Sequence, residues 1–353
     1  MGGKLRIAVV FPPLSGHAKR GVGSYTENLI AALRKNELLD VQITGYGHAY
    51  GSSQLVHYPY FDPFFLTLPL VKVKPATVTV HDLIPLEFPD KFPIGIRGLV
   101  KWQIQRLSLF GSSAIVTDST SSKKSIQKFC GKGVKIHVIY PGVARTFHKV
   151  SSTALLKNTK QKLNLPDNFI LYVGDVNYNK NVVGLIESFK KVSVHDPSIN
   201  LVLAGSGFID KSRELENIKN TIYILGLNKH VTMFGFLPNT ELVHLYNLAT
   251  MYVQPSFAEG FGLPVLEAMA CGIPVVASRT TSIPEIAGSA ALFVNPYDTD
   301  EIARAIMRLF HDKKLQERLI LKGRERFRKF TWESTASNFY KLWYSILKAQ
   351  HHG

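Results

Sequence analysis

The sequence has only two cysteines, Cys130 and Cys271, in 353 residues, and they lie far apart. This scarcity excludes a disulfide framework and a cysteine-based metal site, and it fits a reducing, cytoplasmic compartment. The sequence also lacks any run of about 18 apolar residues, so no transmembrane helix is expected. Residues 1–6 lead directly into an apolar run, 7–11, without the apolar core and cleavage site of a signal peptide.

Acidic residues are also few. The chain has 42 Lys and Arg against 26 Asp and Glu, and residues 1–150 alone have 19 against 8. An excess of positive charge in one half suggests that this half meets an anionic partner. No recognition motif or aromatic–basic alternation points to nucleic acid, so no nucleic-acid partner is expected. An acidic membrane surface or a phosphate-bearing acceptor is favoured, and a surface charge that only maintains solubility is the alternative.

Apolar runs rich in β-branched residues alternate with helical stretches along the chain, which predicts an α/β fold with parallel sheets. A strand followed by a glycine-containing loop and a helix begins at residue 7 and again at residue 169. The length accommodates two such domains, joined near residues 144–155. We expect an N-terminal domain over 1–148 and a C-terminal domain over 149–331.

The most informative stretch is 254–277, which is predicted to form a strand, a loop, a short helix and a second strand. Pro264 suits the first helical position and Gly272 the C-terminal turn. The loop Gly260-Phe261-Gly262 therefore runs into a helix N-terminus, where free amides and the helix dipole favour an anion. Two carboxylates flank this anion site, Glu259 before the loop and Glu267 in the predicted first turn. Carboxylates accept hydrogen bonds from vicinal hydroxyls, so a nucleotide sugar fits the pattern, although each glutamate alone could be structural.

Two other segments carry candidate residues. Lys180 lies near a predicted helix start, where the dipole disfavours a cation, so a role in phosphate binding is indicated. His81 and Asp82 follow the predicted strand 75–80, at the carboxyl end where open parallel sheets bind ligands.

The string EGFGLPVLEAMACGIPVVAS strongly resembles the signature of the retaining glycosyltransferases with the two-Rossmann architecture called GT-B, which has two glutamates at this spacing. VTVHDLIPLEFPDKFP resembles the same family, especially its mannosyltransferases. The resemblance implies two Rossmann-like domains that face each other across a cleft. It also implies a last helix, about 332–353, that crosses back to the N-terminal domain.

The resemblance further implies roles for single residues. His81 and Glu259 contact the transferred sugar, Lys180 contacts the diphosphate, and Glu267 contacts the ribose. The implied catalytic residues are thus His81, Lys180 and Glu259, and the implied donor-binding residues are Gly21, Gly23, Gly205, Phe236, Gly260, Phe261, Gly262, Leu263 and Glu267. Asp82 and Arg20 are the weaker candidates for the acceptor.

The implied reaction moves a hexose, with mannose favoured, from a nucleotide diphosphate sugar to a glycan or lipid-linked hydroxyl with retention of configuration. GDP-mannose is the favoured donor and a UDP-sugar the alternative, and no metal or further cofactor is expected. The sequence departs from the family at Asp175, where an arginine is usual. An unpaired carboxylate beside a diphosphate would repel it, so Asp175 must point away, pair with a cation or contact a hydroxyl. A nucleotide-sugar epimerase and a non-catalytic nucleotide-sugar-binding protein are the alternative functions.

Two basic helices are predicted in the N-terminal half, over 96–109 and after Ser119. They suit a peripheral position on an anionic membrane, and a solvated face is the alternative. The aromatic and proline-rich segment 55–70 is either a loop packed on the core or an apolar rim for the acceptor.

Overall fold

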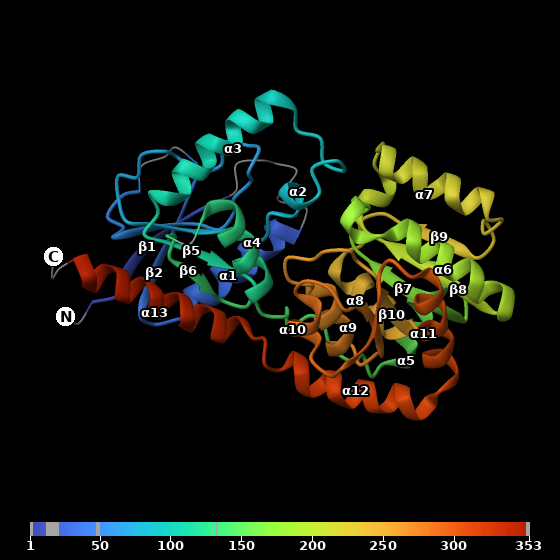
Figure 1. The fold of residues 1–353 in the computed structure, drawn as a ribbon. Coiled ribbons are helices and arrows are strands. Elements are labelled where there is room, and N and C mark those ends of the chain that lie inside the picture. The colour runs from blue at the N-terminus through green and yellow to red at the C-terminus, as the bar shows by residue number, and fades with distance from the viewer. Residues whose placement is uncertain (1–2, 12–20, 47–49, 132, 351–353) are drawn as a thin grey trace. The chain divides into compact units, whose positions relative to one another are not determined.

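The computed structural model describes residues 3–11, 21–46, 50–131 and 133–350, and the chain divides into two units. Unit 1 comprises residues 1–142 and 330–353, and unit 2 comprises 143–329. Each unit contains a six-stranded sheet whose neighbouring strands all pair in parallel (Figure 1). The predicted α/β class with two parallel-sheet domains is therefore confirmed.

Unit 1 has the strand order β2-β1-β3-β4-β5-β6. Buried side chains that alternate along its strands form two clusters, one beneath α1 and α13 and the other beneath α3 and α4. Helix α13 completes the first cluster with Phe339 and Trp343, so the prediction that the last helix packs on the N-terminal domain is confirmed. The elements of unit 1 are β1 (Leu5–Val10), α1 (Gly21–Arg34), β2 (Leu39–Thr44), β3 (Leu55–Tyr58), β4 (Ala76–Thr79), α2 (Ile84–Glu87), α3 (Gly95–Phe110), β5 (Ala114–Thr117), α4 (Thr120–Cys130), β6 (Ile136–Val138) and α13 (Trp332–Gln350).

Unit 2 has the strand order β12-β11-β10-β7-β8-β9. The strands are all parallel, but successive strands are added on one side of β7 and then, from β10 onwards, on its other side. Loops at the carboxyl ends of these two central strands diverge to opposite sides and leave a crevice in folds of this kind. The elements of unit 2 are α5 (Thr153–Lys162), β7 (Asn168–Val173), the 3₁₀ helix η1 (Tyr178–Lys180), α6 (Val182–His195), β8 (Ile199–Ala204), the 3₁₀ helix η2 (Ser206–Ile209), α7 (Arg213–Ile224), β9 (Val231–Phe234), α8 (Asn239–Leu248), β10 (Met251–Gln254), α9 (Leu263–Ala270), β11 (Val275–Ser278), α10 (Ile283–Ala287), β12 (Ala291–Val294), α11 (Thr299–His311) and α12 (Lys313–Phe327).

Side-chain caps set the starts of two helices. The region between α11 and α12 turns at Asp312, whose side chain caps α12 by accepting a hydrogen bond from the Leu315 amide. Ser119 caps α4. No helix within the described residues has the length and hydropathy required to cross a membrane.

Candidate functional site

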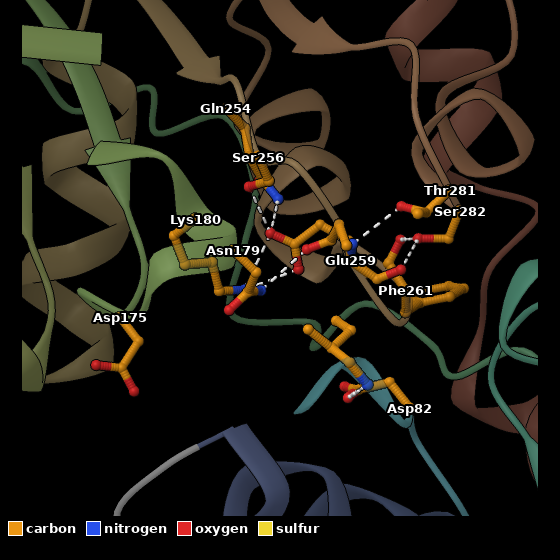
Figure 2. A network of polar contacts seen from close by, with 12 residues as sticks. Asp82, Asp175, Asn179, Lys180, Gln254, Ser256, Glu259, Phe261, Thr281 and Ser282 are labelled. Atoms are coloured by element: carbon orange, nitrogen blue, oxygen red, sulfur yellow. Dashed lines mark hydrogen bonds and ion pairs between the residues drawn. The ribbon is translucent and has the colours of Figure 1, made fainter. Parts of the chain in front are cut away.

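The polar network of unit 2 is centred on the carboxylate of Glu259, which is only 6% exposed. Its Oε1 accepts hydrogen bonds from the side-chain amide of Gln254 and from the hydroxyl of Ser256, each at 2.7 Å. Lys180 Nζ lies 2.9 Å from Oε1 and 2.7 Å from Oε2, so the ammonium group spans both oxygens (Figure 2). A buried carboxylate needs such partners because an unpaired charge away from water is costly.

The Lys180–Glu259 pair lies where the strand order of unit 2 reverses. Lys180 belongs to the loop that follows β7, and Glu259 to the loop that follows β10. Parallel α/β sheets bind their ligands at this switch point, beyond the carboxyl ends of the strands. The topology therefore marks the pair as part of a ligand site, independently of the sequence motif.

Two asparagines hold these loops together on either side of Lys180. Asn179 donates a hydrogen bond to the carbonyl oxygen of Ala258 at 2.9 Å, and Asn181 donates one to that of Pro255 at 3.0 Å. Asn181 has a φ angle of 54°, a left-handed conformation that asparagine tolerates better than most residues. The position of Lys180 opposite Glu259 is thus set by side chain-to-backbone contacts of its two neighbours.

The chain passes from Glu259 into α9 through Gly262. This residue has a φ angle of 107°, and a Cβ atom there would lie 2.6 Å from Ile283 Cδ1, so the turn requires glycine. The Ser282 hydroxyl steadies the same turn, since it lies 2.8 Å from the carbonyl oxygen of Phe261. The first amides of a helix have no acceptor within the helix. The turn over 260–262 and the start of α9 at Leu263 therefore have the geometry of an anion site.

Glu267 is the fifth residue of α9, so it lies in the second turn and not in the predicted first turn. The reason is that α9 begins at Leu263, and Pro264 is correspondingly its second residue. Glu267 Oε2 accepts a hydrogen bond from the Tyr246 hydroxyl at 3.0 Å. Burial raises the pKa of the Glu267 carboxyl to about 7, and the Tyr246 hydrogen bond opposes this only in part. Donors from ligand hydroxyls would offset the cost of ionising this carboxyl.

We predict that Glu267→Gln stabilises the protein at high pH. The pKa of Glu267 is raised on folding, so its stabilising contribution is present below the unfolded value and is lost as pH rises through about 7. The variant should match the wild type near pH 4.5 and exceed it above pH 7 by on the order of 3 kcal/mol at most. Urea unfolding across this range measures the difference, and a difference that does not vary with pH would contradict the prediction.

Glu301→Gln is a control of opposite sign. A hydrogen bond from Arg279 holds the pKa of the Glu301 carboxyl below its usual value, so its contribution is present at neutral pH and is lost as pH falls. This variant should be less stable than the wild type at neutral pH and should approach it in acid.

Asp175 occupies the position at which the resemblance leads one to expect arginine. Its Oδ1 accepts a hydrogen bond from the amide of Val176 at 2.9 Å, and Figure 2 shows its carboxylate apart from the Lys180–Glu259 pair. The carboxylate is thus directed away from the pair, and its arrangement relative to a diphosphate stays a prediction. Lys180 is therefore the cation that the loop after β7 contributes to this site.

Other predicted donor-binding residues lie at the same edge of the unit 2 sheet. Gly205 follows β8, and a Cβ atom there would lie 1.9 Å from the carbonyl oxygen of Gly174, so only glycine permits this close approach of two loops. Phe236 follows β9 and is 63% exposed. The structure thus brings the candidates after β7, β8, β9 and β10 to one edge.

In unit 1 the predicted residue His81 has an acidic partner that the sequence interpretation missed. His81 Nδ1 lies 2.5 Å from Asp118 Oδ2, and Nε2 lies 3.2 Å from the carbonyl oxygen of Pro59. Burial alone would lower the pKa of His81, but the nearby Asp118 carboxylate raises it above its ordinary value. With an acceptor at each ring nitrogen, the site suits the doubly protonated imidazolium. Asp118 follows β5, and His81 follows the adjacent strand β4. This equivalent placement at two strand ends was the sequence signal that could have identified Asp118 as the partner of His81.

The remaining predicted residues of unit 1 have other positions. Asp82 Oδ1 accepts a hydrogen bond from the Ile84 amide at 3.0 Å and so supports the start of α2. Gly21 and Gly23, which the resemblance implies as donor-binding residues, lie in the first turn of α1. Arg20 lies outside the described residues. Among the described residues, no group of three or more His, Cys, Asp or Glu side chains could hold a metal ion.

Comparison with known proteins places this geometry in a family context. Residues 156–326 match the family described as Glycosyl transferases group 1. The chain is 30% identical over 281 residues to the serotype-specific mannosyltransferase WbdA of Escherichia coli. The aligned region covers 78% of this chain and 34% of WbdA. It is 29% identical over 277 residues to the O-antigen chain mannosyltransferase B of Escherichia coli. This aligned region covers 77% of this chain and 71% of that protein. The chain thus spans about a third of the length of WbdA.

The fold is shared with Anabaena HepE, whose crystal structure contains UDP and glucose. The TM-score is 0.76 over 97% of this chain and 100% of HepE, with 17% sequence identity. At this identity the likeness concerns the fold alone.

Proposed function

We propose that this chain, which belongs to the group 1 glycosyltransferases, moves mannose from a nucleotide diphosphate sugar to a hydroxyl group of a glycan or a polyprenyl-linked acceptor. The observation that carries the proposal is the Lys180–Glu259 pair at the switch point of unit 2, beside a helix start suited to an anion. The names of WbdA and mannosyltransferase B support mannose as the sugar. GDP-mannose is therefore the favoured donor, with a UDP-sugar as the alternative because HepE was crystallised with UDP and glucose.

The chemistry follows from where charge develops. As the bond between the anomeric carbon and the phosphate oxygen breaks, positive charge grows on the sugar and negative charge on the departing diphosphate. Lys180 Nζ and the amides of Gly262 and Leu263 would stabilise the diphosphate, since preorganised donors act most strongly on charge that appears in the transition state. Glu259 Oε2, which accepts a hydrogen bond from Lys180, is the oxygen that would also accept one from a hydroxyl of the donor sugar and so orient it.

We propose that the acceptor oxygen bonds to the anomeric carbon on the face from which the diphosphate leaves, so that configuration is retained. The acceptor proton passes to the leaving diphosphate. This route requires neither two opposed catalytic carboxylates nor a metal ion, unlike glycoside hydrolysis. The imidazolium of His81 would contact the transferred sugar and Glu267 the ribose hydroxyls. The positive charge of the N-terminal half would bring the protein to an anionic membrane surface on which a lipid-linked acceptor is presented.

A thermal-shift panel tests the donor first. GDP, GDP-mannose, UDP and UDP-glucose are compared in the presence of a chelator, because a ligand that binds only the folded state raises the melting temperature. We expect guanosine ligands to raise it by several degrees, as about 2.7 kcal/mol at 100 times Kd implies. A shift with uridine ligands alone would replace GDP-mannose with a UDP-sugar as the assigned donor. The absence of a shift with any nucleotide would overturn the proposed function. The anomeric configuration of a product formed from GDP-mannose, measured by NMR, tests retention.

A further inference from the structure

Helix α3 of unit 1 turns apolar side chains towards solvent. Ile96 is 81% exposed and Leu107 65% exposed, and both lie on the same face of the helix. The exposed apolar residues of this face are Ile96, Leu99, Val100, Leu107 and Phe110. Single exposed apolar side chains are ordinary, but a group of five on one helix face, interrupted here only by the exposed Gln103, marks a site of interaction.

On the opposite face of α3, two polar side chains bind the neighbouring segment 65–73. These contacts explain why the polar face is buried and the apolar face is exposed. Gln105 Oε1 accepts hydrogen bonds from the amides of Thr67 and Leu68 at 3.1 Å, and its Nε2 donates to the Leu68 carbonyl oxygen at 3.0 Å. Lys72 Nζ donates to the Ser108 hydroxyl at 3.0 Å. Gln105 and Ser108 are therefore used internally, beside the buried Trp102 and Leu109, and five apolar residues of α3 are left outside.

The segment 65–73 adds further exposed apolar side chains beside α3. Lys101 Nζ of the helix lies 5.3 Å from the centre of the Phe65 ring, so the segment and the helix are in contact. The exposed apolar residues of the segment are Phe65, Leu66, Leu70, Val71 and Val73. Together with the five residues of α3 they form what we call the α3 surface, on one of the outer helices of unit 1 (Figure 1). Phe61 and Leu68 are in the core, as expected if the segment 55–70 packs there.

Positive charge borders the α3 surface. The helix carries Arg97, Lys101 and Arg106 and no acidic residue. With 3.6 residues per turn, Arg97 and Lys101 flank one side of the apolar face and Arg106 the other. An apolar face with a basic border complements a bilayer that contains anionic lipids. A second copy of the chain docked symmetrically on this face would instead bring like charges together.

We infer that the α3 surface is the part of the protein that docks on an anionic lipid bilayer. Its apolar side chains enter the boundary between headgroups and acyl chains, and Arg97, Lys101 and Arg106 contact lipid phosphates. This inference rests on the proposed function in one respect, the lipid-linked acceptor, and selects between the two predicted basic helices. Every residue of α4 is described, and none of its large apolar side chains is exposed.

Co-sedimentation with vesicles tests the inference in the absence of any nucleotide. We expect the protein to bind phosphatidylcholine vesicles that contain phosphatidylglycerol, and to bind pure phosphatidylcholine roughly tenfold less tightly or worse. High salt should weaken the binding because exposed charges are screened. Phe65→Trp should report insertion through quenching by brominated lipids.

Three variants separate the α3 surface from general surface effects. A triple change of Ile96, Leu99 and Leu107 to serine should lower vesicle binding at least tenfold, and it should leave the fold intact because these side chains are more than half exposed. Arg97→Gln with Lys101→Gln should have a similar effect. The control changes to serine three comparably exposed apolar residues of unit 2, Val194, Ile224 and Leu321, and should bind like the wild type.

Three outcomes overturn the inference. The first is that both α3 variants bind vesicles like the wild type, and the second is that the wild type does not bind them. The third is a wild-type dimer that the triple change dissociates while vesicle binding is absent, which would assign the surface to a second copy. Nucleotide-induced thermal shifts should be the same in all these variants. Loss of vesicle binding with intact nucleotide binding therefore concerns the α3 surface alone, and a protein that binds vesicles but no nucleotide contradicts the proposed function alone.

Discussion

Replacing Lys180 with alanine is expected to lower kcat/KM for glycosyl transfer by about 10²- to 10³-fold, as the loss of a preorganised charge-stabilising group does elsewhere. Lys180 is the cation beside the candidate diphosphate position, and Asp175 stands where the resemblance leads one to expect arginine. Initial rates with varied donor concentration provide the measurement. Because the charge acts mainly on the leaving group, kcat should fall more than KM rises.

The same substitution should also destabilise the protein. It leaves the 6%-exposed carboxylate of Glu259 without its cation, and among the described residues Gln254 and Ser256 remain as its side-chain donors. We expect a loss of about 1–3 kcal/mol in the free energy of unfolding, less than for a fully buried pair because the Lys180 side chain is 23% exposed.

A double variant separates these two effects. Lys180→Ala combined with Glu259→Gln removes both charges, so it should recover most of the lost stability and none of the activity. Urea unfolding and donor kinetics on the same preparations provide the comparison. Recovery of activity together with stability would show that Lys180 matters only for folding, and near-wild-type activity of the single variant would remove Lys180 from the site.

Asp118→Asn is expected to lower the transfer rate by about 10- to 100-fold, through His81 and not through direct contact with substrate. The Asp118 carboxylate is 4% exposed and lies 2.5 Å from His81 Nδ1, so it fixes both the ring orientation and the charge. The contact of Nε2 with Pro59 is the longer of the two, at 3.2 Å, which makes Nε2 the nitrogen able to turn to a ligand. Without the carboxylate, burial favours the neutral ring.

The pH dependence of stability distinguishes this positioning role from a general structural one. The pKa of His81 is raised in the folded state, so its contribution is fully present below the unfolded pKa and is lost as pH rises through the folded pKa. The difference in unfolding free energy between the wild type and Asp118→Asn should therefore be largest in mild acid and should shrink towards alkaline pH. Asp167→Asn, at a surface ion pair with Lys160, is the matched control and should show no change in activity. A difference between the wild type and Asp118→Asn that is constant with pH would contradict the role assigned to His81.

The interpretation of the 254–277 stretch shows how far local sequence reaches. Gly262 requires glycine because of its positive φ angle and the nearby Ile283 side chain, and such a requirement is visible in the sequence as a glycine before an apolar helix. Gln254 and Ser256, which donate hydrogen bonds to Glu259, lie within five residues of it. Nothing in their spacing identifies them as its partners. The helical turn predicted for Glu267 depended on where α9 begins, and helix boundaries are the least certain part of such predictions.

The sequence by itself determined the α/β class and the second parallel sheet beginning near residue 169, because periodic burial along strands and helices is a local property. The packing of the last helix on unit 1 was implied by the family resemblance and not by periodicity. Only the tertiary structure decided that Lys180 meets Glu259, that Asp118 meets His81 and that α3 faces solvent with its apolar side. The first two contacts join residues that follow different strands, and so depend on strand order. The third depends on the segment 65–73, which supplies partners for Gln105 and Ser108 and thereby selects the face of α3 that is buried.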